Sequence, residues 1–339
     1  MMAEQDVILE VRNLKQWFPM AKLFYEKQQY VKAVNDISFD LYRGETLGIA
    51  GESGCGKSTL LRSCIRLQEP TDGTIIFDGR DITHWSERKL RPIRHEIQVV
   101  FQDPYSSLDN RWTIGKLMEE PMIVGKRFKT KSERKAKVVE LIEAVGLSAE
   151  YLGRFPHEFS GGQRQRIAIA CALATGPKIL MCDEAVSALD VSVRAQVLNL
   201  LSRLKRQFKL TYMFVSHDMS VIEHICDRVA IMYLGKIMEI GGKRDVFDNP
   251  QHPYTQALLS AVPKADEDVA PEKRIILKGD IPSPANQPTG CVFRTRCKYA
   301  TALCAEQAPE LAEYKGRMVA CHRCTAAYED NNQKESDEG

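Results

Sequence analysis

The sequence predicts an α/β fold with a central sheet, followed by a smaller C-terminal extension. Apolar runs typical of buried parallel strands occur at Thr46–Ala50, Lys178–Cys182 and Tyr212–Val215. Helical apolar spacing marks the segments Lys131–Val145 and Val191–Phe208, which lie between these runs. Because parallel strands are joined by crossover helices, the alternation predicts a parallel arrangement of these strands.

Composition divides the chain into regions. Short or alternating apolar patterns at Val7–Val11, Val31–Val34 and Ile37–Leu41 predict a strand-rich start. Helical spacing, including Gly162–Ala174, dominates about residues 103–177, and proline becomes frequent after Asn249. We expect a main domain over residues 1–241 with a helical subdomain over about 103–177, an extension over 242–330, and a polar, disordered tail over 331–339.

Overall charge and hydropathy exclude several classes of protein. The 339 residues carry a formal net charge of +2, with 44% hydrophobic and 27% charged residues. This near balance predicts no strong global attraction to nucleic acid or lipid. The acidic residues Glu4 and Asp6 argue against a signal peptide, and no apolar run approaches the roughly 20 residues of a membrane-spanning helix. Any membrane work is therefore expected to need other, spanning chains.

A glycine-rich motif of the form G-x-x-x-x-G-K-[ST] follows the strand Thr46–Ala50 and precedes the helical pattern Thr59–Leu67. With the next threonine it comprises Gly51, Glu52, Ser53, Gly54, Cys55, Gly56, Lys57, Ser58 and Thr59. Its backbone N–H groups and the following helix N-terminus form an anion nest. Lys57 is expected to reach the β- and γ-phosphates of a nucleotide, and Ser58 to ligate Mg²⁺. The strand–motif–helix context disfavours the alternative of a chance glycine-rich turn.

Polar groups follow three of the predicted strands. Asp183 and Glu184 end the strand Lys178–Cys182, so Asp183 is expected to hold Mg²⁺ and Glu184 to polarise an attacking water. His217 follows Tyr212–Val215, where open α/β sheets place residues that contact ligands, and we expect it to position the γ-phosphate and water. Gln102, after Ile97–Phe101, is placed similarly for Mg²⁺ or water. Without the glycine-rich motif, a solvated acidic turn would explain the Asp-Glu pair equally well, and a structural role would explain the histidine better.

The segment Ser160, Gly161, Gly162 and Gln163 opens a predicted helix between the glycine-rich motif and the Asp-Glu pair. This Ser-Gly-Gly-Gln sequence resembles the signature motif of ABC ATPases, and Ser187–Asp190 resembles their D-loop. Six features occur along the chain in the family's order. They are the glycine-rich motif, called the phosphate cradle below, then Gln102, the signature motif, the Asp183–Glu184 pair, the D-loop and His217. The resemblance implies a P-loop ATPase of ABC type, with a mixed sheet core, a β-subdomain and a helical subdomain. It also implies that ATP binds between the cradle of one chain and the signature and Asp190 of another.

Further matches resemble the oligopeptide, dipeptide and nickel importer ATPases, closest to their second ATPase subunit. They include Val31–Val34, Phe101–Leu108, His157–Gln163, His252–Thr255 and Gly290–Cys297. The resemblance implies a peripheral protein on the cytoplasmic face of the cell membrane. It implies a heterodimer with a second ATPase, two permease subunits, and an extracytoplasmic solute-binding protein that acts indirectly. A homodimer is the alternative, and the transported solute is left open.

Two positions within the resembled motifs leave questions open. The family usually has proline after the Asp-Glu pair, whereas this chain has Ala185, which removes a fixed φ but no chemical group. Counting from the first strand favours Phe18 as the ring that stacks on adenine, with Trp17 next to it. Both rings are nearly as well explained as core residues.

The chain has ten cysteines, and five of them crowd into Cys291–Cys324. Because Cys55 and Cys182 lie inside nucleotide motifs, we expect a reducing compartment, in which clustered cysteines favour metal binding over disulfides. Zinc would suit paired C-x-x-C spacing, but only Cys321–Cys324 has it. The subfamily resemblance implies instead a structural [4Fe–4S] cluster on Cys291, Cys297, Cys304 and Cys321, with Cys324 as the alternative fourth ligand. Free thiols are the remaining interpretation.

Other functions fit the sequence less well. An ABC ATPase acting on DNA or ribosomes usually has long coiled coils or two cassettes, and this chain has one cassette and no basic run. A regulatory module without catalysis is disfavoured because Lys57, Asp183 and Glu184 are all present. We expect residues 103–113 to contact the permease subunits. Because the nucleotide motifs precede Gly241, we also expect replacement of Cys297 to leave ATP affinity close to wild type.

Overall fold

The computed structural model describes residues 6–21, 28–262, 275–277 and 279–325, apart from the side chains of Pro104 and Ser106. The expected disordered tail lies outside the described residues. The chain forms two compact units, the first from residues 1–9, 41–46 and 77–216, and the second from residues 10–40, 47–76 and 217–339. Among the described residues, no helix combines the length and apolarity needed to cross a membrane.

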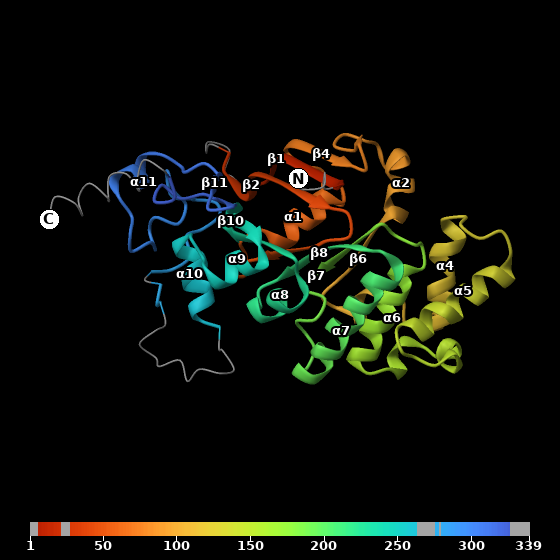
Figure 1. Ribbon diagram of the computed structural model, residues 1–339. Helices are drawn as coiled ribbons and strands as arrows, with labels where there is room; N and C mark the ends of the chain where they lie inside the picture. Colours follow the sequence, from red (N-terminus) through yellow and green to blue (C-terminus); the bar gives the residue numbers. More distant parts are fainter. Residues whose placement is uncertain (1–5, 22–27, 263–274, 278, 326–339) are drawn as a thin grey trace. The chain divides into compact units, whose positions relative to one another are not determined.

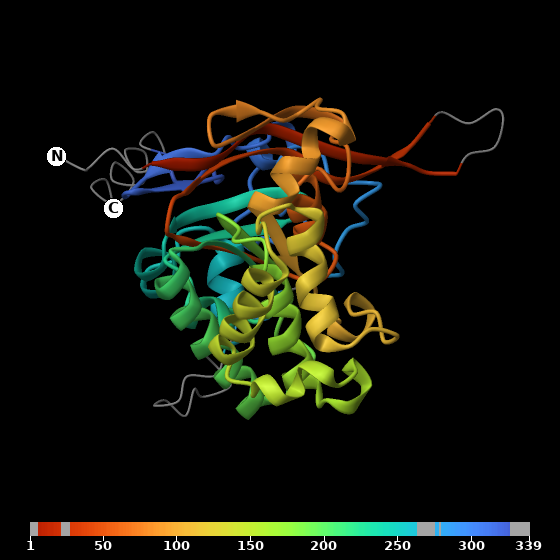
Figure 2. The same ribbon diagram turned by 90° about the vertical axis from the view of Figure 1, so that its right-hand side faces the viewer.

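The first unit contains most of the helices (Figure 1). Its elements are β5 (Arg80–Asp81), α2 (Glu87–Glu96), β6 (Ile97–Val100), α3 (Pro104–Ser107), α4 (Ile114–Val124), α5 (Lys131–Ala144), η1 (Ala149–Gly153), η2 (Pro156–Glu158), α6 (Gly161–Leu173), β7 (Ile179–Asp183), α7 (Val191–Phe208) and β8 (Thr211–Ser216). Every element between residues 103 and 177 is helical, as the sequence predicts. Helices α4, α5 and α6 pack on one another (Figures 1 and 2).

Strands β6, β7 and β8 run parallel in that order. All residues of β7 and β8 are buried, which explains why their sequences are almost entirely apolar. The register pairs Val100 with Cys182 and Asp183 with Val215. The residues that follow β6 and β7 therefore emerge at the same carboxyl edge. Helix α7 buries Val197, Leu201 and Leu204 along one stripe, which is the spacing of an amphipathic helix.

The second unit is rich in strands. Its elements are β1 (Val7–Pro19), β2 (Tyr30–Tyr42), β3 (Thr46–Ala50), α1 (Lys57–Cys64), β4 (Asp72–Phe77), α8 (Met219–Ile225), β9 (Arg228–Tyr233), β10 (Lys236–Gly242), α9 (Lys243–Asp248), α10 (Pro253–Ser260), α11 (Ala302–Glu306), β11 (Ala312–Tyr314) and β12 (Arg317–Val319). Strands β1 and β2 are long neighbours, which Figure 2 shows in red. The two apolar runs expected near residues 31 and 37 form the single strand β2.

The C-terminal extension continues a sheet of this unit. Strand β3 pairs in parallel with β9, β9 pairs antiparallel with β10, and β10 pairs antiparallel with β12, which carries β11 at its outer side. Glu239 faces Val319 in this register. Residues on both sides of Gly241 thus belong to one compact unit, although the domain boundary there remains a prediction.

Candidate nucleotide site and cysteine extension

The glycine-rich motif forms a tight loop between β3 and α1 in the second unit. Gly51 and Gly56 have φ of 151° and 105°, which side-chain-bearing residues rarely adopt. A Cβ on Gly51 would lie 2.2 Å from the Met232 carbonyl oxygen, and one on Gly56 would lie 1.9 Å from the Ala33 carbonyl oxygen. Only glycine fits at these two positions, because the backbone of the loop packs closely against neighbouring carbonyl groups.

Lys57 is held inside this loop. Its ammonium donates to the carbonyl oxygens of Gly51 and Glu52, both at 2.9 Å, and lies 3.8 Å from the Cys55 sulfur. The residue is 4% exposed, and the paired carbonyls satisfy the buried charge. Burial raises the pKa of the neighbouring Cys55 thiol, which keeps it protonated and unreactive. The structure therefore holds the cation that the sequence assigns to phosphate binding at the centre of the cradle.

In the first unit, Asp183 is the last residue of β7 and is 4% exposed. Glu184 is half-buried and has φ of 50°, a left-handed conformation that is uncommon for a residue with a side chain. Its N–H donates to the Val215 carbonyl, and its carbonyl accepts from the Ser187 hydroxyl at 2.9 Å. Ala185, at the position of the family's proline, is 2% exposed. The turn is therefore held by hydrogen bonds and burial in the absence of proline.

Gln102 is exposed and follows β6, the strand that pairs with β7, which ends at Asp183. Asp190 is exposed and is the N-cap residue of α7. In the second unit, His217 is exposed directly after Ser216, the last residue of β8. The predicted site residues thus fall into two groups. Gln102, Asp183, Glu184, Asp190 and the Ser160–Gln163 segment belong to the first unit, whereas the cradle, His217 and Phe18 belong to the second.

The Ser160–Gln163 segment begins α6 with a capping box. The Ser160 hydroxyl accepts from the Gln163 N–H at 3.4 Å, and the Gln163 side chain accepts from the Ser160 N–H at 3.0 Å. The S-x-x-Q spacing in the sequence is the local signal that predicts such a box. The box orients the first N–H groups of a 13-residue helix, so its positive end is available to an anion.

The two candidate adenine-stacking rings are both half-buried in β1. Trp17 already has neighbours, because its ring lies 6.2 Å from that of Tyr30 and carries the Lys32 ammonium at 4.9 Å. The assignment of Phe18 to adenine stacking remains a prediction.

The C-terminal residues reach the cradle itself, which the sequence did not predict. Arg296 pairs with both carboxylate oxygens of Glu52, at 2.7 and 3.1 Å, and the two side chains are 8% and 23% exposed. The Glu52 N–H donates to the Tyr254 hydroxyl at 3.0 Å. No local pattern signals these contacts, since 244 and 202 residues separate the partners. The extension therefore contacts the cradle directly, and the ATP affinity expected of a Cys297 variant stays a prediction.

The cysteines of the extension lie near one another. The pKa of Cys291 is raised to about 11, mainly by burial and to a smaller extent by the thiols of Cys304, Cys321 and Cys297. The Cys321 pKa is lowered to about 6, mainly by a hydrogen bond with Cys324. All ten cysteines are free. In the described part of the chain, no three or more His, Cys, Asp or Glu side chains are arranged to hold a metal ion.

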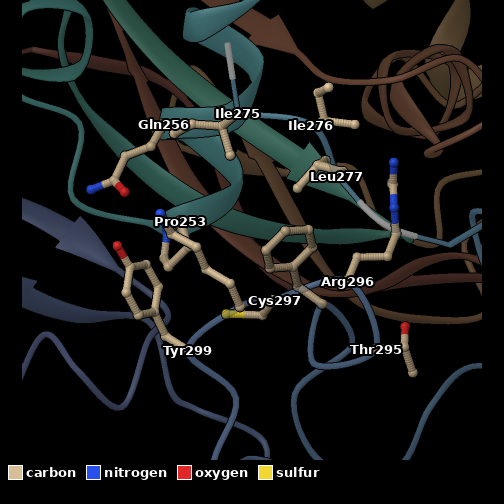
Figure 3. A pocket seen from close by; sticks show the side chains of 11 residues that line it. Pro253, Gln256, Ile275, Ile276, Leu277, Thr295, Arg296, Cys297 and Tyr299 are labelled. Atoms are coloured by element: carbon tan, nitrogen blue, oxygen red, sulfur yellow. The ribbon is translucent and has the colours of Figure 1, made fainter. Parts of the chain in front are cut away.

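A pocket of about 500 Å³ adjoins the turn that carries Arg296 and Cys297 (Figure 3). Ile275, Ile276 and Leu277 lie across it from Cys297 and Tyr299 (Figure 3). Of the residues predicted for nucleotide or metal, only Cys297 lines it. The phosphate cradle is therefore separate from this pocket.

Comparison with known proteins agrees with the motif order. Residues 34–187 match the family described as ABC transporter, and residues 238–304 match the oligopeptide/dipeptide transporter C-terminal region. The oligopeptide transport ATP-binding protein AppF of Bacillus subtilis is 54% identical over 324 residues, covering 94% of this chain and 98% of that protein. The dipeptide transport ATP-binding protein DppF of Haemophilus influenzae is 48% identical over 319 residues, covering 94% and 97%.

Solved structures show the same fold. The ATP-binding cassette MJ0796, in a dimeric post-hydrolysis state bound to ADP and Pi, matches with a TM-score of 0.62 at 28% identity. The match covers 70% of this chain and 99% of that one. CbiO1 of Clostridium perfringens, part of an ABC transporter complex, matches with a TM-score of 0.63 at 26% identity and covers 72% and 92%.

Proposed function

Because this chain belongs to the family of ABC transporter ATP-binding proteins, we propose that it is the ATP-hydrolysing subunit of a peptide importer. The observation that carries the proposal is a complete phosphate cradle in a chain that aligns with peptide-transport ATP-binding proteins over 94% of its length. The match to the peptide-transporter C-terminal region disfavours an ABC ATPase of DNA or ribosomes. A related solute remains the alternative cargo.

The proposed chemistry divides among named residues. Lys57 and the cradle amides would bind the β- and γ-phosphates, while Ser58, Asp183 and Gln102 would hold Mg²⁺ directly or through water. Glu184 would polarise the attacking water, and His217 would position it against the γ-phosphate. Ser160–Gln163 and Asp190 would complete the site of a partner subunit, with the α6 N-terminus facing the nucleotide. Hydrolysis would let the two subunits separate.

We further propose that the partner is a second, different ATPase, and that the pair works on two permease subunits at the cytoplasmic face of the membrane. Residues 103–113 are proposed to contact the permeases. Within the first unit, the Tyr105 ring of α3 is 53% exposed and packs under the Arg164 guanidinium of α6 at 5.1 Å. A displacement of α3 would therefore be transmitted to α6, whose N-cap residue is Ser160.

The cysteines of the extension are proposed to bind a [4Fe–4S] cluster, with Cys291, Cys297, Cys304 and Cys321 as ligands. The crowding of five cysteines into Cys291–Cys324 is the observation that motivates the proposal. The described residues hold no preformed group of three or more metal-binding side chains. Protein purified without oxygen should contain about four irons per chain. Zinc without iron would identify another metal, and the absence of metal would leave the cysteines as free thiols.

The experiment for the whole proposal is co-purification followed by reconstitution. A tagged chain should bring down a second ATPase and two permease chains, which mass spectrometry would identify. In proteoliposomes the complex should accumulate peptide in an ATP-dependent manner, and Lys57→Ala should abolish the uptake. A functional complex with two copies of this chain and no other ATPase would refute the heterodimer. Binding to DNA or ribosomes without permeases would refute transport.

A further inference from the structure

The contact between Glu52 and Arg296 joins an acidic residue of the phosphate cradle to the cysteine-containing extension. The two terminal nitrogens of the guanidinium group, Nη1 and Nη2, donate to the Glu52 carboxylate at 2.7 and 3.1 Å. Such a forked pair is directional and stronger than a single hydrogen bond. The Arg296 side chain is 8% exposed, so solvent screens the pair less than it screens an ion pair at the surface.

The Arg296 guanidinium lies beside a buried cluster of aromatic rings. Its guanidinium carbon lies 5.8 Å from the centre of the Tyr233 ring. The rings of Tyr233, Tyr254 and Phe293 form one buried cluster, with centroids 4.8 to 5.3 Å apart, and each is at most 1% exposed. Tyr254 from the same cluster also accepts the Glu52 N–H at 3.0 Å. The side chain and the backbone of Glu52 are therefore both fixed by residues that follow Gly241.

An acidic side chain in a phosphate cradle has an electrostatic cost. A nucleoside triphosphate brings several negative charges to the loop, and an unpaired carboxylate there would repel them. The carboxylate would also be available to Lys57, whose ammonium already lies 2.9 Å from the Glu52 carbonyl oxygen. Pairing with Arg296 neutralises the Glu52 carboxylate, so that the Lys57 ammonium stays available to bind phosphate.

We propose that Arg296 is a positioning residue for ATP binding, which neutralises Glu52 and holds the first half of the cradle in its phosphate-binding form. The extension therefore sets the nucleotide affinity of the ATPase, and the ligand class is a nucleoside polyphosphate. This inference rests on the proposed ATP-binding function. It assigns to the extension a role in the nucleotide site, in addition to any metal it holds.

The test is a double-mutant cycle in the full-length chain, with ATP affinity measured by titration calorimetry. Arg296→Gln should weaken ATP binding about tenfold, equivalent to about 1.4 kcal/mol, because the unpaired Glu52 carboxylate would repel the phosphates. Glu52→Gln should bind ATP at least as well as wild type. The double variant Glu52→Gln/Arg296→Gln should return to within about threefold of wild type, because the repelling charge is gone.

Controls separate this inference from a purely structural role. Arg294 lies in the same turn, but its side chain donates to Thr289 and does not pair with Glu52, so Arg294→Gln should leave ATP affinity unchanged. Arg296→Lys should restore part of the affinity. A structural role would make Arg296→Gln and the double variant equally weak and equally sensitive to protease, and that result would overturn the inference. Wild-type affinity in Arg296→Gln would also overturn it. If wild type itself binds no ATP, or Lys57→Ala binds it normally, the proposed function fails instead.

Discussion

Arg317 in β12 donates to the carboxylate of Glu239 in β10 at 3.3 Å, and the two side chains are 4% and 0% exposed. The same carboxylate accepts the N–H groups of Gln251 and His252, both at 3.0 Å. Arg317 also donates to the carbonyls of Asp245 and Asn249. A buried charge pair with these added hydrogen bonds ties the short strands of the extension to the sheet of the second unit.

Removal of one partner of this pair should destabilise the protein. Arg317→Ala leaves the Glu239 carboxylate buried and uncompensated, which typically costs about 3–5 kcal/mol of unfolding free energy. Urea denaturation measures the loss. The matched control is Lys15→Ala, which breaks a 2.7 Å pair with Asp72 whose side chains are 30% and 62% exposed. The control should lose much less stability, because exposed ion pairs contribute little. Equal losses in the two variants would contradict the importance of burial.

Acid should destabilise the protein through His252. This residue is 1% exposed, and burial lowers its pKa to about 3, while its Nδ1 accepts the Tyr254 N–H at 3.0 Å. The unfolded chain takes up a proton near pH 6.5 and the folded chain does not, so stability falls as the pH drops below about 6.5. The loss between pH 7 and 5 should be about 2 kcal/mol.

The variant His252→Asn tests this source of pH dependence. Asparagine keeps a side-chain acceptor at the N-cap of α10 but does not titrate, so urea denaturation should lose about 2 kcal/mol less between pH 7 and 5. The exposed His224→Asn is the matched control. An unchanged acid sensitivity in His252→Asn would assign the effect to other groups.

Neighbouring glycines at the start of α6 should respond differently to alanine. A Cβ on Gly162 would lie 2.4 Å from Cγ1 of Val193, whereas a Cβ on Gly161 would meet nothing within 4 Å. Gly162→Ala should therefore cost about 1–3 kcal/mol through overpacking, and Gly161→Ala should be nearly neutral. Thermal unfolding measures both. Adding Val193→Ala should recover most of the loss in Gly162→Ala, and a failure to do so would show that the clash is not its cause.

Hydrolysis should depend on Glu184. Glu184→Gln keeps the shape of the turn and the hydrogen bonds that its backbone makes to Val215 and Ser187, but it removes the charge. ATP binding should persist while hydrolysis falls ~10²–10⁴-fold, the usual contribution of a general base. The assay uses the assembled transporter, with the partner's equivalent carboxylate also replaced. Full turnover in that complex would exclude Glu184 as the base.

The proposed permease contact should appear as a split between transport and hydrolysis. Ser107 is exposed in α3, so Ser107→Trp should impair peptide uptake more than basal ATP hydrolysis. Ser106 is the other sequence-predicted position, and its side chain lies outside the described residues. Ser132→Trp, at an exposed position in the first turn of α5, is the control and should change neither activity. A parallel fall of both activities in Ser107→Trp would give the segment a structural role only.

Local patterns predicted some elements well and missed others for identifiable reasons. Helix α7 spans the predicted residues 191–208, because its apolar stripe is regular over 18 residues. Helix α1 begins at Lys57, two residues before the predicted start, since Gly56 at φ 105° is its N-cap. Helix α4 was not predicted, and it contains Pro121 in its interior, a residue that usually ends a helix. Tertiary packing overrides that local preference.

The sequence by itself determined the buried strands and the glycine-rich motif, because each depends on residues close together in the chain. It also determined the family, because short local motifs occur in the family's order. Only the tertiary structure decided that Arg296 and Tyr254 hold Glu52, and that Arg317 is buried against Glu239. These partners are separated by 244, 202 and 78 residues, respectively. The physical reason is that an ion pair or a hydrogen bond forms wherever folding brings two groups together, and no local periodicity records which distant residue will arrive.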